Sequence, residues 1–182
     1  MPDQVPAKSA TPSGWAGILD PGEEIIWQGR PDAKVIWKVS HIFTFIFGLF
    51  FAGFALFWMV MASAAGGFFW MFGLIHFSVG LGLAIGPPFW SAWRRRHTWY
   101  SLSDRRAFIA TDVPFRGRKL KSYPINSDTA LEYEAGQPAS VHFATEYRRT
   151  KNGSRQVAIG FERIHDGDEV YGKIRAIQRG DG

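Results

Sequence analysis

The feature that most constrains this chain is a run of 55 residues, 39–93, that contains no Asp, Glu, Lys or Arg. A Ser-Ala-Ala-Gly-Gly segment at residues 63–67 divides this run into two apolar stretches, residues 40–62 and 68–90. Each stretch makes a helix of roughly 34 Å, which is enough to cross a hydrocarbon core of roughly 30 Å. The sequence therefore predicts a transmembrane hairpin of two helices over residues 39–93. The alternative, a buried helical hairpin in a soluble domain, needs a longer chain than 182 residues to cover it.

Basic residues flank the predicted hairpin on its outer sides, and the loop between the helices has no charge. Cytoplasmic flanks of membrane helices carry an excess of Lys and Arg, so both termini are expected in the cytoplasm and the loop outside. Tryptophans near both predicted interfaces fit the aromatic belts of spanning segments. The flanking basic residues are Lys34, Lys38, Arg94, Arg95 and Arg96.

Small residues recur at a spacing of four in both predicted helices, which lets helix backbones approach closely in lipid. Two uses stay open: packing of the two helices on each other, and formation of a homo-oligomer. Pro87-Pro88 is expected to end the second helix, because proline cannot continue the hydrogen-bond ladder. The candidate packing residues are Gly48 and Ala52 in the first helix and Ser78, Gly82 and Gly86 in the second.

His76 is the only strongly polar side chain deep in either predicted span. An ionisable residue inside a membrane is a functional candidate, but a proton path needs further ionisable groups and the spans contain none. The sequence therefore favours a neutral histidine hydrogen-bonded to a neighbouring carbonyl, and a functional role for His76 stays open.

The N-terminal tail and the region after the hairpin are polar. Met1 to Ser13 is rich in Pro, Ser, Ala and Thr, and we predict a disordered tail over residues 1–18. Residues 94–178 are expected to form a cytoplasmic, mainly β domain, because short β-prone runs alternate with turn signals. The expected strands are Thr98–Leu102, Arg106–Thr111, Arg118–Tyr123, Ala130–Glu134, Val141–Tyr147 and Arg155–Arg163, and Asp168–Gln178 is an amphipathic helix capped by Asp166 or Asp168.

One more strand is expected before the hairpin, within residues 19–33. Both ends of the hairpin are on one side of the membrane, so Glu24 to Gly29 can pair with the later sheet, and Trp27 is expected in its core. In the last strand pair, alternation places Val141, Phe143, Thr145 and Tyr147 on one apolar inner face. A three-residue loop over residues 151–153, with Gly153 left-handed, would place Phe143 opposite Phe161. The fold class is therefore a membrane α-helical hairpin plus a mainly-β domain of about seven strands, closed by a C-terminal helix.

Three segments, Pro21-Gly22-Glu23, Ile26-Trp27-Gln28-Gly29-Arg30-Pro31 and the run from Trp99 to Ile109, resemble the bacterial pleckstrin-homology-like two-span membrane proteins, a family of unknown function. The resemblance covers roughly Leu19 to Gln178. It implies a PH-like domain, with a bent antiparallel sheet closed by a helix, and a multi-pass protein of the bacterial inner membrane. It brings no catalytic residues. In lipid-binding pleckstrin-homology domains the basic site lies between the first two strands, a connection that the hairpin occupies here.

The sequence contains no recognisable catalytic or phosphate-binding motif and no cysteine, so we predict neither an enzyme nor a cofactor or metal. We predict a membrane-anchored binding or scaffold module that recruits a protein or peptide. The alternative is a small accessory subunit of a transporter or membrane complex. Besides the bilayer, an anionic lipid contact is an expected interaction, and no nucleic-acid partner is expected. The candidate partner or lipid contacts are Phe115, Arg116, Arg118, Lys119 and Lys121.

Overall fold

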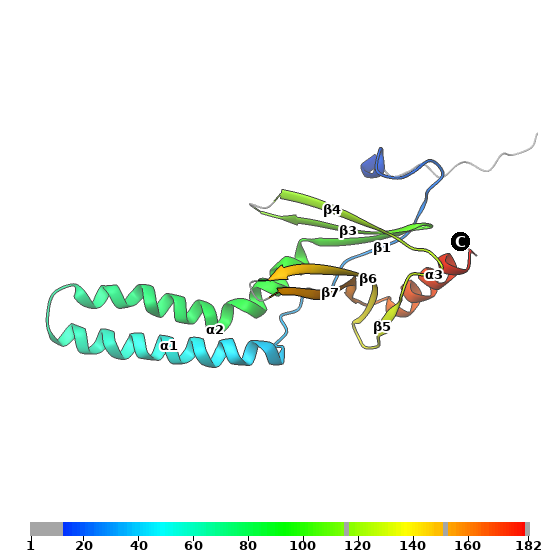
Figure 1. Ribbon diagram of the computed structural model, residues 1–182. Helices are drawn as coiled ribbons and strands as arrows, with labels where there is room; N and C mark the ends of the chain where they lie inside the picture. Colours follow the sequence, from blue (N-terminus) through cyan, green and yellow to red (C-terminus); the bar gives the residue numbers. More distant parts are fainter. Residues whose placement is uncertain (1–12, 115–116, 151–152, 181–182) are drawn as a thin grey trace, which may run out of the picture. The chain divides into compact units, whose positions relative to one another are not determined.

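The computed structural model describes residues 13–114, 117–150 and 153–180, and the chain divides into two compact units. One unit, here called the helical hairpin, comprises residues 32–97. The other, the β domain, combines residues 13–31 with residues 98–180 (Figure 1). The prediction of two apolar helices, a mainly β region and a C-terminal helix is confirmed.

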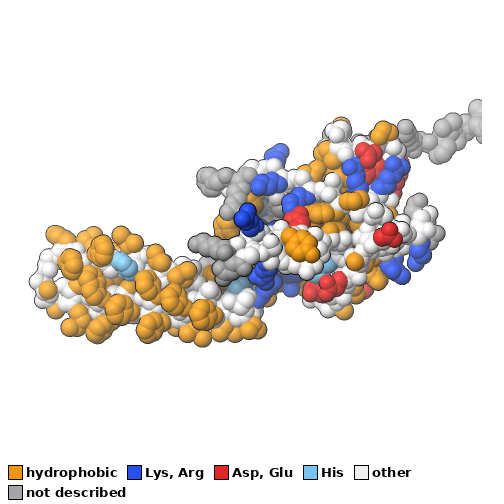
Figure 2. Space-filling view, in the orientation of Figure 1, with side chains coloured by type: hydrophobic (Ala, Val, Ile, Leu, Met, Phe, Trp, Pro, Cys, Tyr) orange, Lys and Arg blue, Asp and Glu red, His pale blue; other side chains and the backbone are white. Residues whose placement is uncertain are grey.

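The helical hairpin contains α1 (Val39–Ala64) and α2 (Phe72–Arg96), and a 3-10 turn, η2 (Phe69–Met71), precedes α2. Both helices are long and apolar enough to span a membrane. Their backbones touch: a Cβ built on Gly48 would lie 2.5 Å from the backbone nitrogen of Ala84. The large apolar side chains point away from this contact and cover the surface of the hairpin (Figure 2).

The second helix does not end at Pro87-Pro88, as the sequence predicted, but continues to Arg96. Proline lacks the amide donor but keeps a helical φ, so a helix can pass through it where other contacts hold the following turns. Arg95, only 8% exposed, supplies such contacts. Its guanidinium donates to the carbonyl oxygens of Asp32 (2.8 Å) and Lys34 (2.7 Å), and thereby fixes the last turn to the segment before α1.

Seven strands form two antiparallel sheets in the described part of the β domain, which confirms the predicted strand number. The resemblance implied one bent sheet, whereas the strands form two separate sheets that do not join into a closed barrel. The core lies between the sheets and the C-terminal helix (Figure 1). The four-stranded sheet contains, in order, β1 (Ile25–Gly29), β2 (Thr98–Ser103), β3 (Arg106–Val113) and β4 (Gly117–Pro124); the three-stranded sheet contains β5 (Glu132–Glu134), β6 (Ala139–Thr150) and β7 (Gly153–Ile164).

Strand β1 joins the sheet across the insertion of the helical hairpin, as the sequence predicts. It pairs antiparallel with β2, with Trp27 opposite Leu102. The Trp27 ring lies in the core, 5.2 Å from the ring of Phe161, and is 8% exposed. Its indole N–H donates to Asp166 Oδ2 over 3.0 Å, so the buried polar atom has a partner.

The register of the β6–β7 pair differs from the predicted one by one residue near the tip, where Thr150 pairs with Gly153 instead of Ser154, and by two residues beyond a bulge. Val141, rather than Phe143, lies opposite Phe161, and the bulge lies between His142 and Ala144. The rings of Phe143 and Phe161 still meet edge to face, with their centroids 5.0 Å apart. A bulge restores the inward direction that a one-residue slip would otherwise reverse.

This bulge changes which side chains face out near the tip of the β6–β7 pair. Thr150 pairs directly with Gly153, and the connecting residues 151–152 lie outside the described residues. Tyr147, predicted on the apolar inner face, is 74% exposed. The bulge also needs a glycine opposite it, because a Cβ on Gly160 would lie 2.1 Å from the carbonyl oxygen of Val141.

The C-terminal helix α3 (Gly167–Arg179) matches the predicted amphipathic helix within a residue at each end. Val170 and Ile174 are fully buried against the sheets. The predicted side-chain cap is absent, because the carboxylate of Asp166 accepts from Trp27 and that of Asp168 accepts from Tyr133. The helix start is therefore tied to the sheets instead of to its own backbone.

Part of the segment predicted to be a disordered tail has a defined structure. Residues 1–12 lie outside the described residues, but Ser13–Trp15 form a 3-10 turn, η1. The ring of Trp15 lies edge-on to Phe108 of β3, with centroids 5.0 Å apart. Trp15 therefore covers part of the four-stranded sheet.

Candidate functional site

Two of the segments that carry the family resemblance meet in a buried ion pair. Glu23, in the turn before β1, accepts hydrogen bonds from Nε and Nη2 of Arg106, the first residue of β3. Ser103 Oγ donates to the same carboxylate over 2.5 Å, and the backbone N–H of Asp20 donates over 2.8 Å. The side chain of Glu23 has no exposed surface.

These donors determine what Glu23 can do chemically. The hydrogen bonds from Arg106, reinforced by Ser103, lower the pKa of Glu23 to about 2 against the opposing effect of burial. A carboxylate that stays ionised and saturated with donors is a poor general base, because proton transfer needs a free lone pair and a pKa near the working pH. The motif residues therefore hold β1 onto the β2–β3 turn, and their contacts are structural.

The residues predicted to contact a partner or lipid, on β4 and the β3–β4 turn, differ in their surroundings. Arg118 pairs with Asp112 on the adjacent strand at 3.1 Å, in an exposed ion pair. Lys121 donates to Glu146 of β6, which also accepts from Tyr123. These hydrogen bonds, that of Lys121 first, lower the pKa of Glu146. Lys119 is exposed on β4, and Phe115 and Arg116 lie outside the described residues.

A cluster of basic residues on the β6–β7 pair was missed by the sequence analysis. Arg148 and Arg155 lie directly opposite each other, and Arg149 pairs with Ser154. The sequence signal was visible as Tyr-Arg-Arg before the turn, but the predicted register assigned Tyr147 to the inner face. The bulge shows that this end of the pair projects as an exposed, basic ribbon.

The outer face of the four-stranded sheet carries a second unpredicted feature, an open groove of about 520 Å³. The guanidinium of Arg30 lies 4.8 Å from the centre of the Trp99 ring, and Gln28 Nε2 donates to Ser101 Oγ over 3.3 Å. Trp15 forms one wall. A groove with rings, an amide, a hydroxyl and one cation can hold a peptide that has apolar and acidic side chains.

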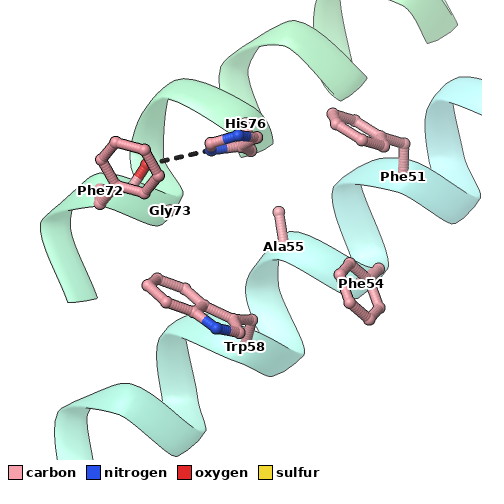
Figure 3. A pocket seen from close by; sticks show the side chains of 7 residues that line it. All are labelled: Phe51, Phe54, Ala55, Trp58, Phe72, Gly73 and His76. Atoms are coloured by element: carbon pink, nitrogen blue, oxygen red, sulfur yellow. Dashed lines mark hydrogen bonds between the residues drawn. The ribbon is translucent and has the colours of Figure 1, made fainter. Parts of the chain in front are cut away.

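The helical hairpin contains an apolar cavity of about 280 Å³ beside His76 (Figure 3). Nδ1 of His76 lies 3.2 Å from the carbonyl oxygen of Phe72, which confirms the predicted hydrogen bond to a neighbouring carbonyl. In this hydrogen bond Nδ1 carries the proton and donates it to the carbonyl oxygen. The remaining lining is Phe51, Phe54, Ala55, Trp58, Phe72 and Gly73.

The candidate packing residues separate into two groups. Gly48 and Ala52 lie at the contact between the helices, and their partners on α2 are Gly80 and Ala84. The stripe Ser78, Gly82 and Gly86 faces elsewhere, and a Cβ on Gly82 or Gly86 would meet no atom within 4 Å. The prediction that Ser78, Gly82 and Gly86 pack against the first helix is therefore wrong. Their use in a homo-oligomer stays a prediction.

Among the described residues, no group of three or more His, Cys, Asp or Glu side chains could hold a metal ion. Comparison of the chain with protein-family models, curated proteins and solved structures finds no match. The assignment of a function consequently depends on the geometry of the two units.

Proposed function

We propose that this chain is a membrane-anchored, pleckstrin-homology-like binding module that recruits a protein or peptide on the cytoplasmic side of a bacterial inner membrane. The observation that carries the proposal is the insertion of the helical hairpin between β1 and β2, which are hydrogen-bonded neighbours. Strands from before and after the hairpin in the sequence form one domain, so two chain connections hold this domain at the membrane. The strand order, the C-terminal helix and the motif residues support membership of the family that the sequence resembles.

The apolar surface of the helical hairpin supports a membrane location over a soluble one. Only 17% of the residues in each apolar window are buried, whereas a core helix of a soluble protein is mostly buried. Phe43 and Phe50 are at least three-quarters exposed. Lipid is the environment in which such side chains are stable without a protein cover. Flanking Lys and Arg favour both termini in the cytoplasm.

The groove on the four-stranded sheet is the proposed contact for the partner. It combines the Trp15 and Trp99 rings with the cation of Arg30, and aromatic and Arg residues dominate protein interfaces. An acidic peptide with an apolar anchor fits this chemistry.

Site-specific crosslinking in native membranes tests the groove. A photoreactive amino acid at Gln28 should capture a specific protein that mass spectrometry identifies, and Arg30→Glu should reduce the capture. The same probe at Ser127, an exposed turn residue away from the groove, is the matched control. Equal capture at both positions would contradict the proposed contact.

An accessory-subunit role is the second candidate, and the exposed Ser78–Gly82–Gly86 stripe favours it. Helix surfaces with small residues four apart are common contacts between membrane helices. Gly82→Leu with Gly86→Leu should release the chain from a detergent-solubilised complex while the β domain stays folded. An unchanged complex would leave the groove as the working surface.

A further inference from the structure

The β domain has a distinct end at which its chain continues into the helical hairpin. In the four-stranded sheet, Gly29 near the exit pairs with Tyr100, and Thr98 at the return pairs with Thr111. The turn that joins β3 to β4 lies at this same end, because β3 continues from Thr111 to Val113 before the turn. The exit, the return and the β3–β4 tip therefore share one edge of the sheet.

The tip of the β6–β7 pair points to the same end. Tyr123 of β4 lies near Phe143, with ring centroids 5.9 Å apart, and Lys121, closer to the β4 tip, reaches Glu146, closer to the β6 tip. The two hairpins thus extend in parallel directions, as Figure 1 shows for β4 and the β6–β7 pair. Together they form what we call the tethered end.

Charge in the β domain is divided between this end and the opposite one. The described part of the two tips has a clear cationic excess, with only Asp112 and Glu146 as carboxylates. The opposite end, where α3 begins and β5 lies, has a run of acidic residues that includes Asp166, Asp168 and Glu169. The basic residues of the tips are Arg118, Lys119, Lys121, Arg148, Arg149 and Arg155.

The arrangement of the arginines on the β6–β7 ribbon does not serve the stability of the ribbon. Arg148 and Arg155 are directly opposite each other, and like charges at that position destabilise a strand pair. The carboxylate of Glu146 interacts with the charge of Arg148, but its hydrogen bonds come from Lys121 and Tyr123 and it offsets only part of the repulsion. An external anionic surface would remove the repulsion.

Tyr147 adds the second property that such a surface needs. Its ring is 74% exposed near the tip of the ribbon, on the same face as Arg149 and on the face opposite to that of Arg148 and Arg155. Tyrosine prefers the headgroup level of a bilayer, where its ring is in a partly apolar layer and its hydroxyl stays hydrated. Basic residues and an exposed aromatic ring therefore occur together where the chain connects to the membrane segment.

We propose that the described strand ends at the β3–β4 and β6–β7 tips, residues 117–121, 147–150 and 153–155, form a docking surface for anionic phospholipid headgroups. The surface binds the cytoplasmic leaflet by charge, with Tyr147 at headgroup depth, and thereby fixes the direction in which the β domain presents its groove. The inference rests on the proposed membrane anchoring and adds to it a lipid class and the residues that bind it. An acidic protein is the competing occupant, and the experiment distinguishes the two.

Full-length protein in lipid nanodiscs tests the proposal. The chain has no cysteine, so Ser154→Cys places a single environment-sensitive fluorophore on the ribbon. Nanodiscs of phosphatidylcholine alone are compared with nanodiscs that also contain phosphatidylglycerol. We expect a blue shift and higher intensity only with the anionic lipid. Raising the salt from about 0.1 M to about 1 M, which shortens the Debye length from about 10 Å to about 3 Å, should reverse the change.

Two matched double variants locate the effect. Arg148→Gln with Arg155→Gln should lower the docking equilibrium by about 30-fold, because each cation near an anionic leaflet contributes about 1 kcal/mol. The same variant should melt no lower than the parent, since it removes a like-charge pair. Lys173→Gln with Arg175→Gln on α3 makes the same change in charge at the opposite end and should dock normally.

Three results would overturn the docking surface: identical spectra in both lipids, an equal loss in the α3 variant, or a response in neutral nanodiscs to added polyglutamate but none to anionic lipid. The last result would assign the surface to an acidic protein. Failure of the chain to enter nanodiscs would instead contradict the membrane anchoring, so the two failures are distinguishable.

Discussion

The helical hairpin and the β domain solve packing in opposite ways. In the hairpin, small residues such as Gly48 and Gly80 let two backbones touch, and the large side chains face out. In the β domain, large rings such as Trp27 and Phe161 fill the interior, and most charged side chains face out. In the proposed lipid surroundings, which are themselves apolar, size rather than hydrophobicity selects the inner residues of the helical hairpin. In water the hydrophobic effect selects them.

The largest expected effect concerns the β domain, because its core depends on a strand from before the hairpin. A fragment that starts at His97 lacks β1 and Trp27, and loss of a buried Trp alone typically costs about 3–5 kcal/mol. We expect this fragment to show no cooperative thermal transition and to aggregate through its open sheet edge. Circular dichroism and light scattering measure both.

Fusion of Leu19–Pro31 to His97 through a short Gly/Ser linker should restore a cooperative transition. A short linker is enough, since Gly29 and Tyr100 are paired. If the fragment without β1 is monomeric and melts at the temperature of the fused version, the contribution of β1 to the core is refuted.

The ion pair of Glu23 is expected to have the next largest effect. The folded pKa of about 2 lies below the unfolded value of 4.5, so the ionised carboxylate stabilises the fold above pH 4.5. That contribution, about 3 kcal/mol at 1.36 kcal/mol per pKa unit, is lost as the pH falls from 4.5 toward 2. Glu23→Gln should therefore destabilise the fused domain at pH 7 and have a much smaller effect near pH 2.

Chemical denaturation at several pH values measures this difference. A destabilisation by Glu23→Gln that is the same across the whole pH range would assign the effect to lost packing instead of ionisation. Asp104→Asn, in the neighbouring β2–β3 turn, is the control, because the Asp104 side chain is 26% exposed.

Substitutions of glycines on α2 test the packing of the helical hairpin. A Cβ on Gly80 would lie 2.6 Å from the backbone nitrogen of Ala52, where no side-chain rotation can relieve the clash. Gly80→Ala should cost about 1–3 kcal/mol through overpacking. Gly82→Ala meets no atom within 4 Å and should be neutral or stabilising, because Ala favours helix over Gly by up to about 1 kcal/mol.

Thermal aggregation of the full-length protein in detergent compares the two variants. Equal melting temperatures would mean that the helices do not touch along the Gly48–Gly80 line. A loss only for Gly82→Ala would place the contact on the other stripe.

The sequence predicted the arrangement of the elements better than the direction in which their side chains point. The charge-free run indicated both helices. Because two spans bring the chain back to the side of the membrane that it left, the sequence also predicted the pairing of β1 with the later sheet. Spacing alone could not tell which small-residue stripe of α2 faces α1, because both stripes repeat every four residues. Packing of the whole hairpin decides the rotation of each helix.

The same limit explains the corrections near the candidate sites. Alternation predicts which residues share a face but not where a bulge interrupts it, so Tyr147 was placed inside. Composition predicted a tail before residue 19, although Trp15 packs on Phe108. Arg95 gave only a topology signal, and its contacts to two carbonyl groups need coordinates to be recognised. For Trp15 and Arg95, a long-range contact outweighs a local pattern.

The smallest expected effect lies at the tip of the β6–β7 ribbon, far from the core that dominates the β domain. Gly153 has a φ of +123°, a backbone conformation that side chains with a branched Cβ rarely adopt. No atom lies within 4 Å of its added Cβ, so Gly153→Val acts through backbone strain alone and should cost about 1 kcal/mol. The neighbouring Ser154→Val is the control, since valine suits an exposed strand. An equal melting temperature for the Gly153 variant and the parent would mean that the ribbon relaxes at its tip without cost. The core would then set the stability of the β domain alone, and the ribbon would be free to follow the surface that it binds.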